Sequence, residues 1–314
     1  MAKISIIGAG MVGSSIAYAA MIKGLVREIS LVDANKELAA GQALDLSHGN
    51  AYVRPAIVRG GGYELSKDSD IVVITAGRPQ KDGETRLHLL RDNAKIVEES
   101  VAASLSYSKD PIFVVVTNPV DVLTWVAWKA SGMHSTRIIG SGTTLDTARL
   151  RQSIAEHCNL DPRNVHAYVM GEHGDSEIVA WSSADIGGIP IRSFCDDCAM
   201  NCGGAMFEQI FEDTKKAAYT IIEKKGSTYY GIGLATTKII GTILNDQHSV
   251  LTVSTVHRNL YGSPEVALSI PTVVGRNGVE RVLSISLSEE EEAGLRRSAG
   301  VIADAIKSLR EVRE

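Results

Sequence analysis

Residues 4–13 read Ile-Ser-Ile-Ile-Gly-Ala-Gly-Met-Val-Gly, and this stretch decides the fold. Apolar residues typical of a buried strand run directly into a Gly-x-Gly-x-x-Gly pattern that opens a helical segment. There Gly8 permits a tight turn, Gly10 lets the backbone approach a pyrophosphate, and Gly13 lets the helix pack against the strand. The stretch therefore predicts a βα unit that binds a dinucleotide.

An acidic residue at the end of the next expected strand supports this prediction. Asp33 lies about twenty residues after Gly13, where a carboxylate accepts hydrogen bonds from ribose hydroxyls. It also repels a 2′-phosphate, which favours NAD over NADP. A glycine turn that serves only close packing is the alternative. We assign Met11 and Val12, between the glycines, to the same NAD site.

Short β-branched segments alternate with helical segments through the first half of the chain. The expected strands are residues 4–7, 28–32, 71–75, 111–117 and 137–139, and the expected helices are residues 11–23, 35–46, 86–107 and 120–131. This alternation is typical of βαβ units, and near-continuous apolar strands are covered on both faces. We predict an α/β protein whose N-terminal NAD-binding domain, residues 1–141, is a Rossmann doubly wound parallel sheet.

The pattern changes after about Ser141. The expected helices are 143–157, 204–225 and 228–246, and the expected strands lie near 165–170, 250–256 and 266–275. Ser288 and Glu291 have the spacing of a capping box that opens a terminal helix over 289–312. We predict a C-terminal α+β catalytic domain over residues 142–314.

Composition excludes several classes of protein. The 314 residues carry a formal net charge of −5, without the basic excess that binding to nucleic acid needs. The longest apolar runs are strand-length, so we expect no transmembrane helix. No signal peptide precedes the first strand, and we therefore expect a cytoplasmic protein.

The four cysteines are too few to staple a chain of this length. They are Cys158, Cys195, Cys198 and Cys202. The last three have a spacing that suits zinc, but no second cluster of Cys or His lies near them in sequence. We expect free thiols and no metal.

Five further stretches carry a specific resemblance. They are residues 75–86 (TAGRPQKDGETR), 117–121 (TNPVD), 145–151 (LDTARLR), 171–175 (GEHGD) and 225–228 (KGST). With the glycine turn, they resemble the L-lactate dehydrogenase branch of the lactate/malate dehydrogenase family over essentially the whole chain. The resemblance implies NAD-dependent, reversible hydride transfer between NADH and pyruvate, giving (S)-lactate.

Such a reaction needs a proton donor for the carbonyl oxygen and a cationic clamp for the neighbouring carboxylate. His173 follows an apolar strand in a glycine-flanked turn and is the expected acid/base, because imidazole titrates near neutral pH. The resemblance implies that Asp146 orients His173. It also implies that Arg149 grips the substrate carboxylate and that Arg86, on a mobile loop, polarises the carbonyl.

The resemblance adds further contacts with substrate and cofactor. It places Asn118 on the substrate oxygen and beside the cofactor, Thr228 in the substrate pocket, Ile232 beside the nicotinamide and Gly77 in the cofactor site.

Under this resemblance, Gln80 is the residue that distinguishes lactate from malate dehydrogenases. Relatives that act on malate carry arginine there, because the second carboxylate of oxaloacetate needs a cation in a closed pocket. Arg78 or Lys81 could supply that cation if the loop shifted by a residue, so malate dehydrogenase is the first alternative. The second is a non-catalytic NAD-binding protein, which would have no reason to keep His173 and its cationic partners.

Arg151 and His166 match positions that bind phosphate groups across a subunit interface in relatives activated by fructose 1,6-bisphosphate. Both residue types suit a phosphate dianion, although His166 could simply be packed. The resemblance therefore implies an allosteric enzyme of fermentation that acts after glycolysis, and a homotetramer, with a dimer as the alternative assembly.

Overall fold

Six parallel strands form the N-terminal part of the central sheet. They are β1 (Lys3–Ile7), β2 (Glu28–Val32), β3 (Ile57–Gly61), β4 (Ile71–Ile74), β5 (Ile112–Val115) and β6 (Ile138–Gly140). Their order is β6-β5-β4-β1-β2-β3, so the chain crosses the sheet between β3 and β4. The order therefore reverses between β1 and β4, and this is the position where doubly wound sheets bind their ligands.

The computed structural model describes residues 2–78, 84–197, 204–262 and 264–311.

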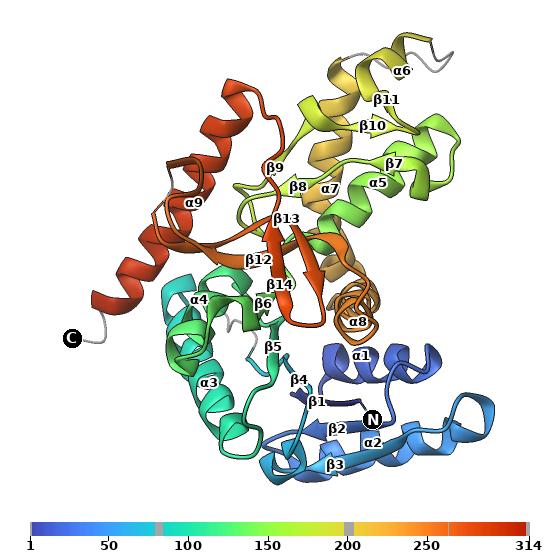
Figure 1. Cartoon of the computed structure of the whole chain (residues 1–314), viewed down its shortest axis with the longest axis vertical. Helices are drawn as coiled ribbons and strands as arrows, with labels where there is room; N and C mark the ends of the chain where they lie inside the picture. The colour runs from blue at the N-terminus through green and yellow to red at the C-terminus, as the bar shows by residue number, and fades with distance from the viewer. Residues whose placement is uncertain (1, 79–83, 198–203, 263, 312–314) are drawn as a thin grey trace.

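Helices cover both faces of this sheet (Figure 1). On one face lie α1 (Met11–Ile22) and α2 (Lys36–His48), and on the other lie α3 (Arg86–Leu105) and α4 (Val120–Ser131). Within β4, Ile71 and Val73 pack with the first pair of helices, whereas Val72 and Ile74 pack with the second. Because strand side chains alternate between faces, each strand serves two cores. The predicted Rossmann fold is confirmed.

An antiparallel region extends the same sheet. It consists of β12 (Ser249–His257), β13 (Val266–Gly275) and β14 (Gly278–Val282), and it joins β6 through the pair Ser254 and Gly140. Helix α8 (Tyr230–Leu244) packs against α1, and α9 (Glu289–Glu311) packs against α3 and α4.

The capping box that opens α9 is confirmed. The Ser288 backbone N–H donates to Glu291 Oε2 at 2.8 Å, and the Glu291 backbone N–H donates to Ser288 Oγ at 3.2 Å. Two N–H groups of the helix start are thereby satisfied.

The rest of the C-terminal half packs around a separate core at the upper right of Figure 1. Its helices are α5 (Thr144–Cys158), α6 (Ile191–Asp197) and α7 (Gly204–Lys225), and its strands are β7 (Val165–His166), β8 (Val169–Met170), β9 (Ile178–Val179), β10 (Asp185–Ile186) and β11 (Ile189–Pro190). The single strand expected over 165–170 is two strands, because β7 pairs with β10 whereas β8 pairs with β9. The predicted α+β character of this half is confirmed.

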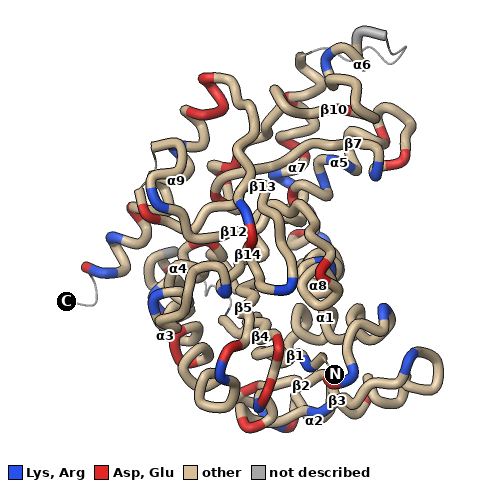
Figure 2. Tube along the Cα trace, in the orientation of Figure 1, with Lys and Arg blue, Asp and Glu red and all other residues tan. Residues whose placement is uncertain are grey.

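Charged residues of both signs are interspersed along the chain (Figure 2). The clearest acidic segment is the first turn of α9, residues 289–292, where carboxylates interact favourably with the helix dipole. Within the described residues, no helix is both long and apolar enough to cross a bilayer.

Candidate active site

The glycine turn lies between β1 and α1, at the carboxyl end of the parallel strands. Gly8 has φ +106°, and a Cβ atom there would lie 2.6 Å from Thr75 Oγ1. A Cβ on Gly13 would lie 1.9 Å from the Gly8 carbonyl oxygen. At Gly10, by contrast, no atom lies within 4 Å of a Cβ position. The first and third glycines are therefore required by packing, whereas the second borders open space.

Asp33 follows β2 and braces this turn. Its Oδ2 accepts the backbone N–H of Ala9 at 2.8 Å, and its Oδ1 accepts the backbone N–H of Asn35 at 2.8 Å. The carboxylate is therefore fixed beside the turn, where an adenosine ribose would be recognised.

Residues at the start of α1 and around the start of α8 lie on this side of the sheet. Met11 is exposed and Val12 partly buried, and Ser227 Oγ lies 3.4 Å from Met11 Sδ. Thr228 follows Ser227 directly and is partly buried. Ile232 packs on the core that the sheet forms with α1 and α2. The segment before α8 thus lies beside the glycine turn.

His173 and Asp146 form a hydrogen-bonded pair in the C-terminal half. His173 Nδ1 lies 2.6 Å from Asp146 Oδ2, and Arg149 Nη1 donates to Asp146 Oδ1 at 2.7 Å. Asp146 lies in the first turn of α5 and is 3% exposed, whereas His173 lies in the loop between β8 and β9. Asp146 therefore joins the imidazole to the guanidinium, and the structure brings these three predicted residues together.

The electrostatics of the pair favour a charged imidazole. Burial opposes the charge on His173, but Asp146, Asp121 and Glu177 together outweigh burial and raise the pKa of His173 to about 9. Burial acts to raise the pKa of Asp146, but His173 and Arg149 lower it overall. At neutral pH the pair is therefore an imidazolium next to a carboxylate.

A second buried carboxyl group, for which the sequence predicted no role, holds the backbone of His173. Asp121 lies in the first turn of α4 and is 2% exposed. Its Oδ2 accepts the His173 backbone N–H at 2.7 Å, and its Oδ1 accepts Ser254 Oγ–H at 2.6 Å and Ser269 Oγ–H at 3.4 Å. Burial raises the pKa of Asp121 to about 6.

The expected substrate loop is described only at its ends. Gln80 lies outside the described residues, and Arg86 is the first residue of α3. Before the gap, Arg78 Nη2 donates to Asp92 Oδ2 at 2.7 Å and Arg78 Nη1 donates to Glu84 Oε2 at 2.7 Å. The pair with Glu84 joins the two ends of the loop to each other, and the pair with Asp92 fixes the first end to α3.

Buried Asn93 links this region to the end of β5. Its Oδ1 accepts the Arg78 backbone N–H at 2.9 Å, and its Nδ2 donates to the Asn118 carbonyl oxygen at 3.1 Å. A Cβ on Gly77 would lie 2.5 Å from Thr117 Cγ2, so this approach needs glycine. Asn118 is separated by Pro119 alone from α4, the helix whose first turn supplies Asp121.

The two residues predicted to bind the bisphosphate, Arg151 and His166, make contacts within the C-terminal half. Arg151 Nε donates to the Ala167 carbonyl oxygen at 3.0 Å, and exposed His166 lies 3.5 Å, through Nδ1, from Asp185 Oδ1. Both therefore belong to one patch of a single chain. Cys158 is partly buried and Cys195 is buried, and Cys198 and Cys202 lie outside the described residues.

Family models cover almost the whole chain. Residues 2–140 match the NAD binding domain of lactate/malate dehydrogenase, and residues 143–312 match the alpha/beta C-terminal domain of the same family.

Curated relatives and solved structures agree with these models. L-lactate dehydrogenase from Kosmotoga olearia is 63% identical over 99% of this chain and 98% of its own length, and that from Thermoanaerobacter pseudethanolicus is 49% identical over 98% and 99%. The crystal structure of minor L-lactate dehydrogenase from Enterococcus mundtii has a TM-score of 0.94 at 40% identity and covers 98% of both chains. A lactate dehydrogenase from a deep-sea metagenome has a TM-score of 0.95 at 42% identity, covering 98% of this chain and 99% of its own.

Proposed function

The chain belongs to the lactate/malate dehydrogenase family, and we propose that it acts as an L-lactate dehydrogenase, interconverting pyruvate with NADH and (S)-lactate with NAD⁺. It is an NAD-dependent enzyme, since its N-terminal part matches the NAD binding domain of the family. Relatives named L-lactate dehydrogenase at 63% and 49% identity support the choice of lactate. The observation that carries the proposal is the buried chain of contacts from His173 through Asp146 to Arg149.

The residues around the glycine turn fit NAD. The open space at Gly10 leaves room for a pyrophosphate at the start of α1, where backbone N–H groups are free of side-chain caps. Asp33 lies where it would accept the ribose hydroxyls and repel a 2′-phosphate. Gly77, Asn118 and Ile232 complete the proposed site, in which the nicotinamide ring gives or takes the hydride.

His173 is the proposed proton donor to the pyruvate oxygen and the acceptor of the hydroxyl proton of lactate. Asp146 occupies Nδ1, so the opposite nitrogen, Nε2, is left to face the substrate. With a pKa of about 9, His173 carries its proton at neutral pH, as pyruvate reduction requires. Oxidation of lactate needs the neutral imidazole ring of His173, so its rate should increase as the pH rises.

Cationic and amide side chains would hold the substrate. We propose that Arg149 binds the carboxylate with the N–H groups that Asp146 leaves available and that Arg86 stabilises negative charge on the carbonyl oxygen. Asn118 would donate a hydrogen bond to the same oxygen, and Thr228 would line the pocket.

The test is to follow NADH oxidation with pyruvate and with oxaloacetate in the wild-type protein and in Gln80→Arg. We expect the wild type to prefer pyruvate and the variant to move toward oxaloacetate, because the new cation compensates the second carboxylate. A His173→Ala variant should bind NADH but lose turnover by orders of magnitude. Wild-type preference for oxaloacetate would identify a malate dehydrogenase, and NADH binding without turnover would identify a non-catalytic protein.

Activation by fructose 1,6-bisphosphate forms part of the same proposal. Arg151 and His166 lie in one patch, and two such patches facing each other across a subunit interface would supply four groups for the two phosphates. The assays above should be repeated with the bisphosphate, which we expect to lower the apparent KM for pyruvate. An unchanged KM would remove these residues from an effector site.

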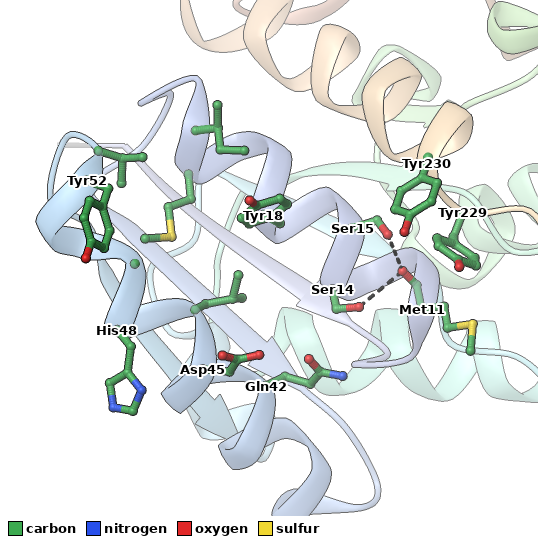
Figure 3. A pocket seen from close by; sticks show the side chains of 15 residues that line it. Met11, Ser14, Ser15, Tyr18, Gln42, Asp45, His48, Tyr52, Tyr229 and Tyr230 are labelled. Atoms are coloured by element: carbon green, nitrogen blue, oxygen red, sulfur yellow. Dashed lines mark hydrogen bonds between the residues drawn. The ribbon is translucent and has the colours of Figure 1, made fainter.

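The proposed assembly is a homotetramer, with two domains per subunit. An apolar face, which we define as Tyr18, Ile22, Leu44, Tyr52, Tyr230 and Leu234, is exposed on and around α1, α2 and α8. Part of this face lines a hollow of about 730 Å³, to which Tyr18, Tyr52 and Tyr230 contribute (Figure 3). Exposed apolar faces of this kind mark contacts between subunits.

We place the domain boundary at 141/142, and the family models support it by ending at 140 and beginning at 143. As a lactate dehydrogenase, the protein would work in the cytoplasm, reoxidising the NADH that glycolysis produces during fermentation.

A further inference from the structure

Glu177 is a buried carboxyl group beside the His173 pair that the mechanism above does not use. It immediately precedes β9 and is 5% exposed. Its Oε1 atom is buried without a hydrogen-bond partner. Burying an ionised carboxylate without a partner is strongly unfavourable, so this environment favours the neutral acid.

The surroundings of Glu177 link it to the acid/base residue. One ligand atom each of Glu177, Asp146 and His173 lie within 4.8 Å of one another. The other charged groups that act on Glu177 are cations, Arg149 on α5 and Lys215 on α7. Burial and the negative charge of Asp146 outweigh the charge on His173 and these two cations, and they raise the pKa of Glu177 to about 8.

Asp121 is the third carboxyl group that raises the pKa of His173. It approaches from α4 and binds the backbone N–H of His173 rather than the ring. Glu177 is therefore, like Asp146, a carboxyl group that acts on the imidazole ring of His173.

We propose that Glu177 is a positioning residue for the acid/base step, one that stays neutral at neutral pH and extends into alkaline solution the range over which His173 keeps its proton. This inference rests on the proposed function of His173. When the pH rises, Glu177 ionises and its new negative charge stabilises the imidazolium at short range. When His173 gives its proton to pyruvate, the lost positive charge makes Glu177 hold its own proton more firmly. The two groups thus titrate as a coupled pair.

The direct test measures the protonation of His173 and does not depend on catalytic turnover. We would follow the ring carbons of ¹³C-labelled histidine by NMR against pH in the wild type, in Glu177→Gln and in Glu172→Gln, identifying His173 by the signal lost in His173→Asn. We expect Glu177→Gln to lower the midpoint of His173 by about one pH unit, because the variant cannot ionise. Glu172→Gln, which removes a carboxylate from the same loop that already accepts a hydrogen bond from Ser176, should leave the midpoint unchanged.

The pH dependence of catalysis should shift in the same direction as the titration midpoint of His173. In Glu177→Gln the alkaline limb of kcat/KM for pyruvate should move to lower pH while the Kd for NADH stays constant. An unchanged His173 midpoint in folded Glu177→Gln would overturn the inference even if the enzyme reduces pyruvate. A wild type without turnover would instead overturn the proposed function.

Infrared spectroscopy of the wild-type protein keeps the inference falsifiable if Glu177→Gln does not fold. With ¹³C-labelled glutamate, a protonated side-chain carboxyl band should be present at pH 6.5 and should disappear toward pH 9. Absence of a protonated glutamate band at pH 6.5 would contradict a neutral Glu177.

Discussion

Asp146 binds two cationic side chains at once, one with each carboxylate oxygen. His173 Nδ1 lies 2.6 Å from Oδ2, and Arg149 Nη1 lies 2.7 Å from Oδ1. A proton donor and a carboxylate clamp are therefore held by one buried group on the first turn of α5. A shift of Asp146 would displace the two proposed substrate contacts together, so the geometry of the reaction depends on the start of this helix.

Replacing Arg149 by lysine tests the clamp. A lysine keeps the charge but loses the planar pair of N–H donors, so we expect the KM for pyruvate to rise by about 100-fold. The Kd for NADH should change little. Steady-state kinetics and NADH fluorescence titration measure the two quantities, with Arg163→Lys, in an exposed ion pair with Asp161, as control. An unchanged KM would show that Arg149 does not hold the carboxylate.

Asp146 and Arg149 were predicted together, and the resemblance paired Asp146 with His173, whereas other residues that the fold brings to His173 were missed. The spacing of Asp146 and Arg149 indicated neighbouring positions on a helix, and the structure joins them by a hydrogen bond. Asp121 stands 52 positions from His173, and only the pairing of β6 with β12 brings Ser254 to the other side of its carboxylate. Linear order holds no record of such contacts, so neither Asp121 nor Glu177 received a predicted role.

At the level of elements, apolar runs were the reliable guide. β4 and β5 are buried throughout, and their continuous β-branched sequences identified them. The edge strand β3 was not predicted, because its sequence Ile-Val-Arg-Gly-Gly is half-buried and ends in glycine. Residues 165–170 form two strands because Ala167 and Tyr168 lead the chain from one small sheet into another. Whether these residues form one strand or two depends on partner strands that are distant in sequence.

The turn from β1 to α1 permits a matched test of packing against binding. Gly13→Ala places a methyl group 1.9 Å from the Gly8 carbonyl oxygen, so we expect a loss of about 1–3 kcal/mol in the free energy of unfolding. Gly10→Ala meets no protein atom within 4 Å. We therefore expect it to preserve stability but to weaken NADH binding by about tenfold or more, because its methyl group occupies the space proposed for the pyrophosphate.

Thermal unfolding and NADH titration on both variants separate these effects. Unchanged NADH affinity in Gly10→Ala would place the pyrophosphate elsewhere. Unchanged stability in Gly13→Ala would mean that the turn relaxes more easily than its packing indicates.

On the scale of the whole molecule, one sheet runs through both halves of the chain. β6 pairs with β5 in parallel and with β12 in antiparallel fashion, so the C-terminal strands continue the Rossmann sheet. The sequence predicted two domains and their fold classes, but not this continuity, because it depends on the single pair of Ser254 with Gly140. Through it, the half that holds His173 is fixed relative to the glycine turn.

The apolar face defined above leads to a prediction about assembly. Ile22, at the end of α1, is 54% exposed in this face, and Val301 on α9 is a comparable apolar residue at 46% exposure outside it. Burying a charge in a subunit contact without a partner is unfavourable, so Ile22→Glu should shift the proposed tetramer to smaller species in sedimentation velocity at micromolar concentration. Val301→Glu should sediment as the wild type does. If the wild type sediments as a monomer, or if only Val301→Glu dissociates, the contact surface lies elsewhere and this apolar face needs a different explanation.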